Sequence, residues 1–290
     1  MDIPEDWTRI KDDYVQWAHA STSLHAQKTI EVTPVPANKK PLRFLDVACG
    51  TGVVPEILAQ KYTNPEDAII LATDFAQGMV DHVEKIKQER QWKNVETKVM
   101  DATAMSLPDS SMDVIFCVFG VMLIPNSEKA LSEMYRVLEE GGSVAIVTWH
   151  YQAIWPIFME ATAKINALAQ VSAPTAVEAP KVPFGLSTDD AKQQAKKSWV
   201  NLDYCKEKLE AAGFKDVKGL EEKNVFRIPD LKEFMTVSLR NPGFASMTAN
   251  WSSELTQKFK DLVIESFKEK YGDKDEYHMD VSSNILYARK

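Results

Sequence analysis

The sequence lacks long apolar runs and has few cysteines, and each shortage excludes a class of protein. No stretch approaches the roughly 18 apolar residues of a membrane helix, so no membrane partner is expected. The acidic start, MDIPEDW, lacks the basic and then apolar regions of a secretory signal. The three cysteines, Cys49, Cys117 and Cys205, lie far apart and predict reduced thiols in a cytoplasmic protein.

Metal-binding patterns and an excess of basic residues are also missing. The five histidines do not pair at ligand spacing, and neither C-x-x-C nor H-E-x-x-H occurs, so no metal is expected. The net charge of −8 argues against nucleic acid as a partner. The 44% hydrophobic content of the 290 residues is ordinary for a globular protein. With a metal and nucleic acid not expected, the expected partner is a small molecule. The composition does not indicate an oligomeric state.

Strand-like and helix-like segments alternate along the first half of the chain. Short apolar segments predict strands at 41–48, 67–73, 95–101, within 112–123 and at 143–149, with helices at 54–62, 75–90 and 127–142. Such alternation indicates a parallel sheet with helices on both faces. The 75–90 helix is expected to have one apolar face, formed by Phe75, Met79, Val83 and Ile86. Gly141 and Gly142 are expected to cap the C-terminus of the 127–142 helix.

The flanking segments follow a different pattern. We expect helices at 5–30, 153–169 and 201–213, a loop or lid at 171–190, a strand at 215–226, mostly helix at 230–271 and a last strand at 282–290.

The stretch FLDVACGTGVVPEIL, residues 44–58, predicts a strand, a glycine loop and a helix start. It lacks the third glycine of a dinucleotide motif, because Pro55 stands there, and no Lys-Ser or Lys-Thr follows as in a P-loop. A carboxylate at Asp46, four residues before Gly50, favours a cationic ligand group and would repel a pyrophosphate. A plain tight turn at Gly50 and Gly52, and a helix-start partner at Asp46, remain as alternatives.

LDVACGTG resembles the first motif of class I S-adenosylmethionine-dependent methyltransferases, D/E-x-A/G-x-G-x-G. That motif is filled in order by Asp46, Ala48, Gly50 and Gly52. ATDFAQGM resembles the second motif, which implies that Asp74 takes the ribose hydroxyls while Phe75 and Met79 flank the adenine. Since Phe75 and Met79 are four residues apart, core packing is the alternative for both.

Two later segments resemble further motifs of this family. In VMDATAMSLPDSSMDVI, the resemblance implies that Asp101 accepts from the adenine amine and that the Ala102 N–H meets the ring. A simple turn is the alternative for Asp101. VFGVML implies that Val118, Phe119 and Gly120 lie beside the methionine part of the cofactor, S-adenosyl-L-methionine.

The resemblance implies a Rossmann-like, seven-stranded, doubly wound α/β sheet with an antiparallel last strand and a helical cap. The chain 1–290 would form a single domain, with an N-terminal helical cap at 1–40, a cofactor-binding core at 41–150, and cap insertions and last strands at 151–290. The chain is also similar to fungal secondary-metabolite methyltransferases, including the gliotoxin thiol methyltransferase group. This similarity lies in four short stretches: VETK, LPD, VFG, and TW followed by WPI.

The expected activity is methyl transfer to sulfur, oxygen or nitrogen of a small, partly apolar metabolite. Aromatic residues expected to line the acceptor site are Tyr14, Trp17, Trp149 and Trp155. His150, after the fifth strand, is the candidate base, with an uncommitted surface histidine as the alternative. Two other functions stay open: cofactor binding without methyl transfer, as a cyclase or binding protein, and an NAD-dependent oxidoreductase.

Overall fold

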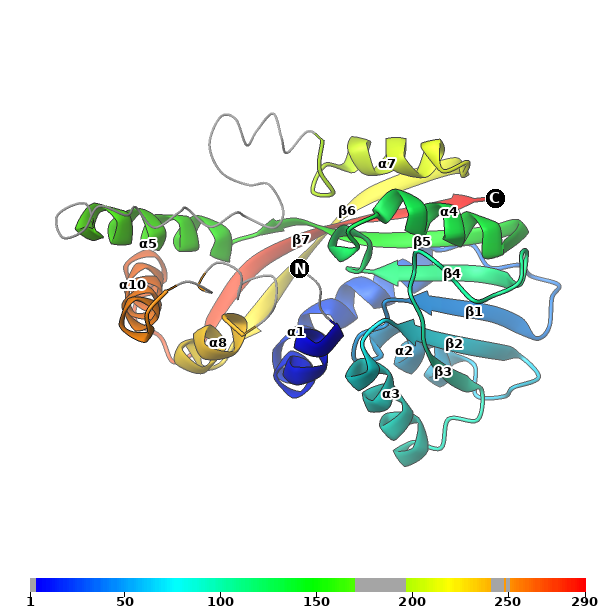
Figure 1. Cartoon of the computed structure of the whole chain (residues 1–290), viewed down its shortest axis with the longest axis horizontal. Coiled ribbons are helices and arrows are strands. Elements are labelled where there is room, and N and C mark those ends of the chain that lie inside the picture. Colours follow the sequence, from blue (N-terminus) through cyan, green and yellow to red (C-terminus); the bar gives the residue numbers. More distant parts are fainter. Residues whose placement is uncertain (1–3, 170–196, 241–247, 249–250) are drawn as a thin grey trace.

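A seven-stranded sheet, ordered β3-β2-β1-β4-β5-β7-β6, organises the computed structural model (Figure 1). The structure describes residues 4–169, 197–240, 248 and 251–290. The strands are β1 Leu42–Val47, β2 Ala68–Asp74, β3 Val95–Val99, β4 Met112–Val118, β5 Leu138–Gln152, β6 Lys215–Ile228 and β7 Tyr277–Arg289. The helices are α1 Pro4–Val32, α2 Val53–Lys61, α3 Gln77–Glu89, α4 Ser127–Val137, α5 Ile154–Ala169, α7 Leu202–Ala211, α8 Leu231–Ser238 and α10 Ser253–Tyr271, with a short 3₁₀ turn η1 Val121–Leu123.

The first five strands run parallel, and β7 inserts antiparallel between β5 and β6. This arrangement confirms the expected doubly wound sheet with an antiparallel last strand. The strand order reverses between β1 and β4, which are neighbours in the sheet although β2 and β3 separate them in the chain. Ligands of open α/β sheets bind at such a switch point, beyond the carboxyl ends of the strands.

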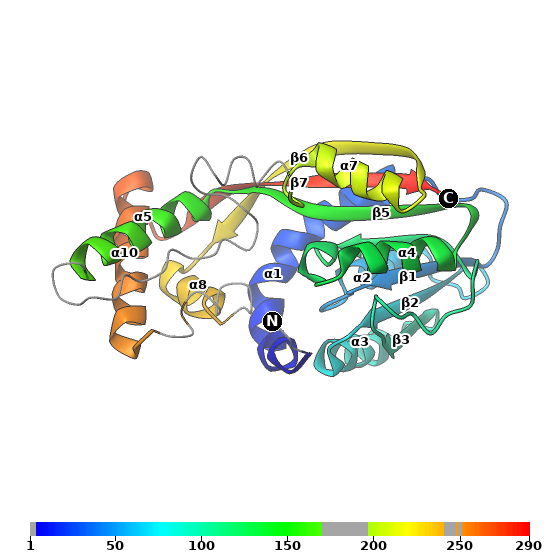
Figure 2. The same cartoon turned by 45° about the horizontal axis from the view of Figure 1, so that its top comes forward.

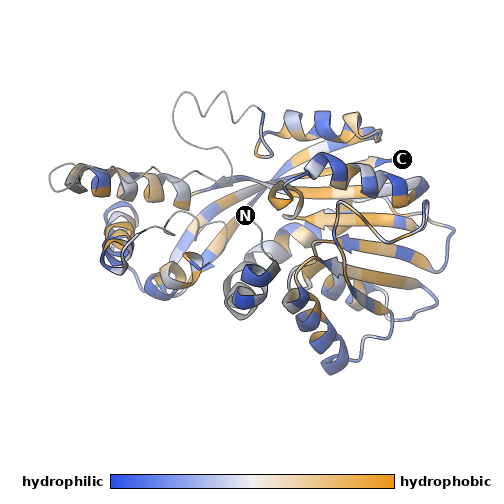
Figure 3. Cartoon of the chain, viewed as in Figure 1, coloured by the Kyte–Doolittle hydropathy of each residue, from blue (hydrophilic) through white to orange (hydrophobic). Residues whose placement is uncertain are grey.

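Helices cover both faces of the sheet (Figure 2). On one face α2 lies against β2 and α1 contacts β5, β6 and β7, and Ile30 of α1 and Leu58 of α2 share a buried cluster with apolar residues of β1 and β4. On the other face α4 and α7 join a second cluster through Met134 and Leu209. The central strands are therefore apolar on both sides, as Figure 3 shows for β1, β4 and β5.

A helical extension, formed by α5, α8 and α10, lies beyond the far ends of β5, β6 and β7 (Figure 1). It has its own buried cluster, in which Phe158 of α5, Met235 of α8 and Phe259 of α10 are fully buried. The extension occupies much of the segment expected as cap insertions; the expected 171–190 loop lies outside the described residues. The division of the chain into cap and core remains a prediction.

Two expectations about helix ends are wrong. The α4 helix ends at Val137, because Leu138 is already extended and pairs with Met112 at the start of β5. Gly141 and Gly142 therefore lie inside β5 and do not cap the helix. Gly142 is needed there because a Cβ atom would come 2.8 Å from the carbonyl oxygen of Asp113 on β4.

Phe75 does not share the apolar face of α3. The helix begins at Gln77, because the backbone at Ala76 is still extended. The Asp74 carboxylate accepts a hydrogen bond from the Ala76 N–H. The Phe75 side chain is 41% exposed, whereas Met79 and Val83 are buried as expected.

No helix in the described part of the chain combines the length and the apolar character that a membrane crossing requires.

Candidate active site

The loop after β1 contains three residues in the left-handed backbone conformation. Ala48, Gly50 and Gly52 have φ angles of 57°, 52° and 87°. At Gly52 an added Cβ atom would lie 2.9 Å from the Val83 side chain, so only glycine lets α2 begin this close to α3. The glycines of the predicted motif thus let the backbone of this loop lie close to α3.

Asp74 holds this loop from the end of β2. It is 6% exposed and accepts hydrogen bonds from the N–H groups of Gly50 and Ala76, both at 2.9 Å. Burial raises the pKa of Asp74 and outweighs the opposing effect of these backbone hydrogen bonds. Each carboxylate oxygen has a further lone pair with which it can accept from a ligand hydroxyl.

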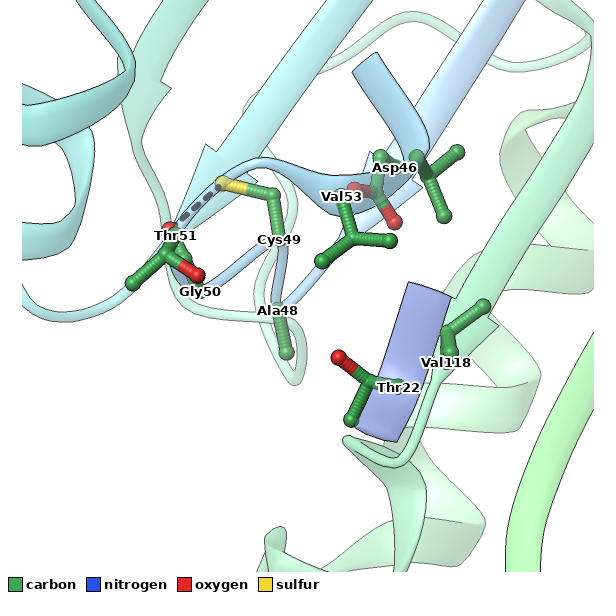
Figure 4. Close-up of a pocket in the computed structure, with 9 residues that line it drawn as sticks. Thr22, Asp46, Ala48, Cys49, Gly50, Thr51, Val53 and Val118 are labelled. Atoms are coloured by element: carbon green, nitrogen blue, oxygen red, sulfur yellow. Dashed lines mark hydrogen bonds between the residues drawn. The ribbon is translucent and has the colours of Figure 1, made fainter. Parts of the chain in front are cut away.

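Asp46 lies beside the loop with an unused acceptor. It is 2% exposed, and its Oδ1 atom has no hydrogen-bond partner among the described residues. Burial, and secondarily the negative charge of Asp74, raises its pKa well above the ordinary value. Asp46 borders a cavity of about 30 Å³ that is also lined by Thr22, Ala48, Cys49, Gly50, Thr51, Val53, Val54 and Val118 (Figure 4).

The buried carboxylate of Asp46, whose Oδ1 atom has no hydrogen-bond partner among the described residues, tests whether the residues present fit S-adenosylmethionine. A buried polar group without a partner costs free energy, and an ionised one costs more. The cofactor's methionine part carries an ammonium group and a sulfonium, both cationic. A cation beside Asp46 would favour the ionised carboxylate, so the residues present fit the group.

Helix α1 closes over the loop. His19 contacts the Thr51 hydroxyl at 3.3 Å through Nδ1 and the Glu56 carboxylate at 3.3 Å through Nε2. At the start of α3, the Gly78 N–H donates to the Thr8 hydroxyl at 3.0 Å. A cavity of about 30 Å³ has room for about one water molecule. Asp74 and Phe75, the residues predicted to contact the ribose and the adenine, do not line this cavity.

The residues expected around the adenine differ in exposure. Phe75 is exposed next to Asp74, while Met79 is 2% exposed in the protein interior, as its core alternative requires. Asp101 is exposed, and its Oδ1 accepts from the Thr103 N–H at 2.7 Å, as its turn alternative requires. Ala102 is half-buried against the core. The adenine contacts of these four residues remain predictions.

The structure brings Val118 and Phe119 to the candidate site from the end of β4. Val118 lines the cavity with Asp46. Phe119 has a φ angle of 58° and stacks on Trp149 of β5, with ring centroids 4.0 Å apart. Trp149, predicted to contact the acceptor, therefore lies next to the residue predicted to contact the methionine part.

Other predicted acceptor residues are not gathered here. Trp155 is 2% exposed and packs inside the helical extension, with its ring centroid 5.9 Å from that of Phe158. Tyr14 and Trp17 belong to α1, but their side chains lie outside the described residues. Their contacts with an acceptor remain predictions.

His150 is held away from the lining of the cavity. Its Nδ1 lies 3.0 Å from the Val200 carbonyl oxygen, and its Nε2 lies 3.8 Å from the Glu221 carboxylate. Trp149, the residue before it, contacts α1 on the other face of the sheet through His25. The contact with Val200 therefore places the predicted base beside the segment before α7.

Sequence reasoning missed three polar residues of α1: His19, Thr22 and His25. Thr22 lines the cavity, and His25 is fully buried against Phe119 and Trp149. A signal was available, because Thr22, His25 and Thr29 recur at helical spacing on the same face as the apolar Ala26 and Ile30. Polar residues in a buried helical stripe indicate contacts that composition alone does not reveal.

Comparison with known proteins gives consistent matches. Residues 44–142 match the sequence model of a family described as "Methyltransferase domain". Methyltransferase tpcH of Aspergillus fumigatus is 28% identical over 209 residues, covering 71% of this chain and 69% of that protein. Demethylmenaquinone methyltransferase of Bacteroides fragilis is 37% identical over 109 residues, covering 37% of this chain and 43% of that protein.

Two solved structures share the fold. The [4+2]-cyclase SpnF has a TM-score of 0.53 at 20% identity, over 92% of this chain and 81% of that one. Phosphoethanolamine N-methyltransferase 2 of Haemonchus contortus, solved with S-adenosylhomocysteine, has a TM-score of 0.52 at 16% identity, over 93% of this chain and 52% of that one.

Proposed function

We propose that this class I S-adenosylmethionine-dependent methyltransferase, a distant relative of fungal secondary-metabolite methyltransferases, methylates a heteroatom of a small, partly apolar metabolite. The observation that carries the proposal is the Oδ1 atom of Asp46 beside the glycine loop, which has no hydrogen-bond partner within the described ranges. When bound, S-adenosylmethionine supplies an electrophilic methyl group on a cationic sulfur. Asp46 would accept from its ammonium group, and Asp74 would accept from its ribose hydroxyls.

The chain's own residues would then do two further things. Phe119 and Trp149 would present aromatic surface to the acceptor beside the methionine part. Helix α1, through Thr22 and the contacts of His19, would exclude water from the reacting atoms. Alignment of the acceptor for in-line displacement and exclusion of water are what this reaction requires of a protein.

The acceptor proposed for first study is a thiol. The resemblance to the gliotoxin thiol methyltransferase group supports sulfur, and an apolar aromatic wall suits a flat or apolar molecule. Phenols and amines are the other acceptors to compare.

The proposal is tested by calorimetric titration of S-adenosylhomocysteine into the wild type and Asp74→Ala. We expect micromolar binding that weakens roughly 10- to 100-fold in the variant, because hydrogen bonds to a charged group are lost. Asp203→Ala, which removes an 84% exposed carboxylate on α7, is the matched control and should bind like the wild type. No binding to the wild type would refute the proposed cofactor site.

Cofactor binding is separated from methyl transfer by a second measurement. Formation of S-adenosylhomocysteine from S-adenosylmethionine is followed by mass spectrometry with a panel of thiols, phenols and amines. Cofactor binding without turnover of any acceptor would favour a cyclase or binding role over methyl transfer.

A further inference from the structure

His25 is a buried polar side chain that the cofactor site does not explain. It is fully buried on α1. Its ring meets those of Phe119 and Trp149 edge-on, at centroid distances of 5.5 and 5.6 Å. One turn earlier on the same face of α1, Thr22 lines the cavity that Asp46 borders. His25 therefore lies beyond the cofactor cavity, at the aromatic wall proposed for the acceptor.

The polar contacts of His25 use only one of its two ring nitrogens. Nδ1 lies 2.8 Å from the Ser283 hydroxyl of β7 and 3.3 Å from the Asn224 amide nitrogen of β6. An amide nitrogen can only donate, so Nδ1 accepts, and the proton of the neutral ring resides on Nε2. Nε2 is buried and has no hydrogen-bond partner among the described residues.

The surroundings keep this imidazole neutral. Among the described residues, the side chains with hydrogen-bond or ring contacts to the imidazole are Ser283 of β7, Asn224 of β6, Phe119 after β4 and Trp149 of β5, and none of these four carries a charge. The acid of the adjoining cavity is Asp46 on β1. Burial lowers the pKa of His25 to about 4, so the ring does not change charge near neutral pH.

A neutral N–H donor that is buried without a partner costs free energy in the ligand-free protein. Such a cost is retained where a ligand supplies the missing acceptor. Phe119, which is 5% exposed, and Trp149 stack on each other beside this donor, so its neighbours are apolar rings, and the ligand that fits combines an apolar ring system with an acceptor atom.

We propose that the Nε2–H group of His25 hydrogen-bonds the nucleophilic atom of the methyl acceptor, which binds in ionised form as a thiolate or phenolate against Phe119 and Trp149. This inference rests on the proposed function. The acceptor's proton goes to water on binding. In the transfer, the acceptor's lone pair forms the new bond to the methyl carbon, and the electron pair of the broken C–S bond returns to the cofactor sulfur. His25 keeps its proton throughout and orients the attacking atom.

Binding of two matched ligands to the protein saturated with S-adenosylhomocysteine tests the inference. 4-Nitrothiophenol is a thiolate at neutral pH, and 4-nitrothioanisole is its uncharged S-methyl ether. We expect His25→Phe to weaken thiolate binding roughly 10- to 100-fold, since a charge-assisted hydrogen bond is lost, and thioether binding less than about 2-fold. His25→Gln should keep part of the preference, because its amide can still donate.

His278→Gln is the control, since His278 is largely exposed on β7. Equal losses for the two ligands, or no loss in His25→Phe, would overturn the inference. So would a wild type that binds S-adenosylhomocysteine but not the thiolate. A wild type that does not bind S-adenosylhomocysteine would instead refute the proposed function.

The wild-type protein provides an independent readout in case the variants do not fold. Ring ¹⁵N shifts of the five histidines are recorded with labelled histidine and bound S-adenosylhomocysteine. We expect the His25 ring to have protonated Nε2 and unprotonated Nδ1, and its Nε2 signal to move when 4-nitrothiophenol is added. A protonated Nδ1, or an Nε2 signal unmoved by the saturating thiolate, would contradict the assignment.

Discussion

At the scale of single residues, the candidate site is built from groups that are unfavourable in the ligand-free protein. Within the part of the chain that the structure describes, neither Oδ1 of the buried Asp46 nor Nε2 of the buried His25 has a hydrogen-bond partner. Gly52 adopts a left-handed conformation at a position where a side chain would strike Val83. Binding sites commonly keep such unfavourable groups, because the bound ligand provides the compensating contacts.

Asp46→Asn should stabilise the ligand-free protein while weakening cofactor binding. Because burial raises the pKa of Asp46, the folded state binds more protons than the unfolded state, whose carboxyl titrates near 3.8. The stability of the wild type therefore falls as pH rises from about 3.8 through the raised pKa, and stays lower above it. Asparagine does not titrate, so the variant should be more stable by about 1–3 kcal/mol at pH 8.

Urea unfolding at pH 4 and pH 8 measures this difference, and calorimetry with S-adenosylhomocysteine measures the loss of affinity. Asp203→Asn is the exposed control and should change neither quantity. A variant that is less stable than the wild type at pH 8 would show that Asp46 has a structural role.

At the scale of elements, an ionic cluster ties three parallel strands together at the end opposite the candidate site. Asp113 of β4 accepts from the Arg43 N–H of β1 at 2.8 Å and from its guanidinium at 2.9 Å. Lys39 also contacts Asp113, at 2.6 Å, and Glu139 of β5 pairs with both Lys39 and Arg43. These contacts keep residue 139 extended, which helps explain why α4 ends before the two glycines.

Asp113→Asn should destabilise the fold most at neutral pH. Burial opposes ionisation of Asp113, but hydrogen bonds from Arg43 and Lys39 outweigh it and keep the pKa below the ordinary value of 3.8. The stabilisation is therefore complete above about pH 4 and is lost as pH falls through the lowered pKa. Because Arg43 and Lys39 are about one-third exposed, we expect a loss of about 1–3 kcal/mol.

Thermal or urea unfolding between pH 2.5 and pH 7 measures the difference between this variant and the wild type. Asp109→Asn, on an exposed carboxylate paired with Arg136, is the control. A destabilisation that does not shrink in acid would indicate that packing, rather than charge, makes Asp113 important.

At the scale of the whole molecule, the sheet core and the helical extension are separate apolar clusters linked by three long strands. β5, β6 and β7 have 15, 14 and 13 residues, and they run from the cofactor half into the extension. Ring contacts among Phe158, Phe259 and Trp251 hold the extension together. Cofactor binding and the stability of the extension should therefore be separable.

Phe259→Ala should loosen the extension without affecting the cofactor site. Removal of a fully buried phenylalanine costs about 3–5 kcal/mol, including the cavity that remains. Hydrogen exchange should rise in α5, α8 and α10, while affinity for S-adenosylhomocysteine changes less than about twofold. The exposed Lys258→Ala on α10 is the control; loss of cofactor affinity in Phe259→Ala would mean that the two halves are coupled.

The sequence alone determined the order of the strands and helices and the motif around Asp46, Gly50, Gly52 and Asp74. These features depend on local periodicity, glycine conformation and short spacings, which are written along the chain. It also indicated the extra helices after Trp149, although not that they pack into a separate cluster.

Tertiary structure alone decided which side chains meet across the sheet. It brought His25 of α1 to Ser283 of β7, 258 positions later, and turned His150 toward Val200 instead. It also moved Leu138 from the expected helix into β5, through pairing with Met112. The physical reason is the same in each case: strand pairing and helix docking join residues far apart in the sequence, and no local pattern encodes those contacts.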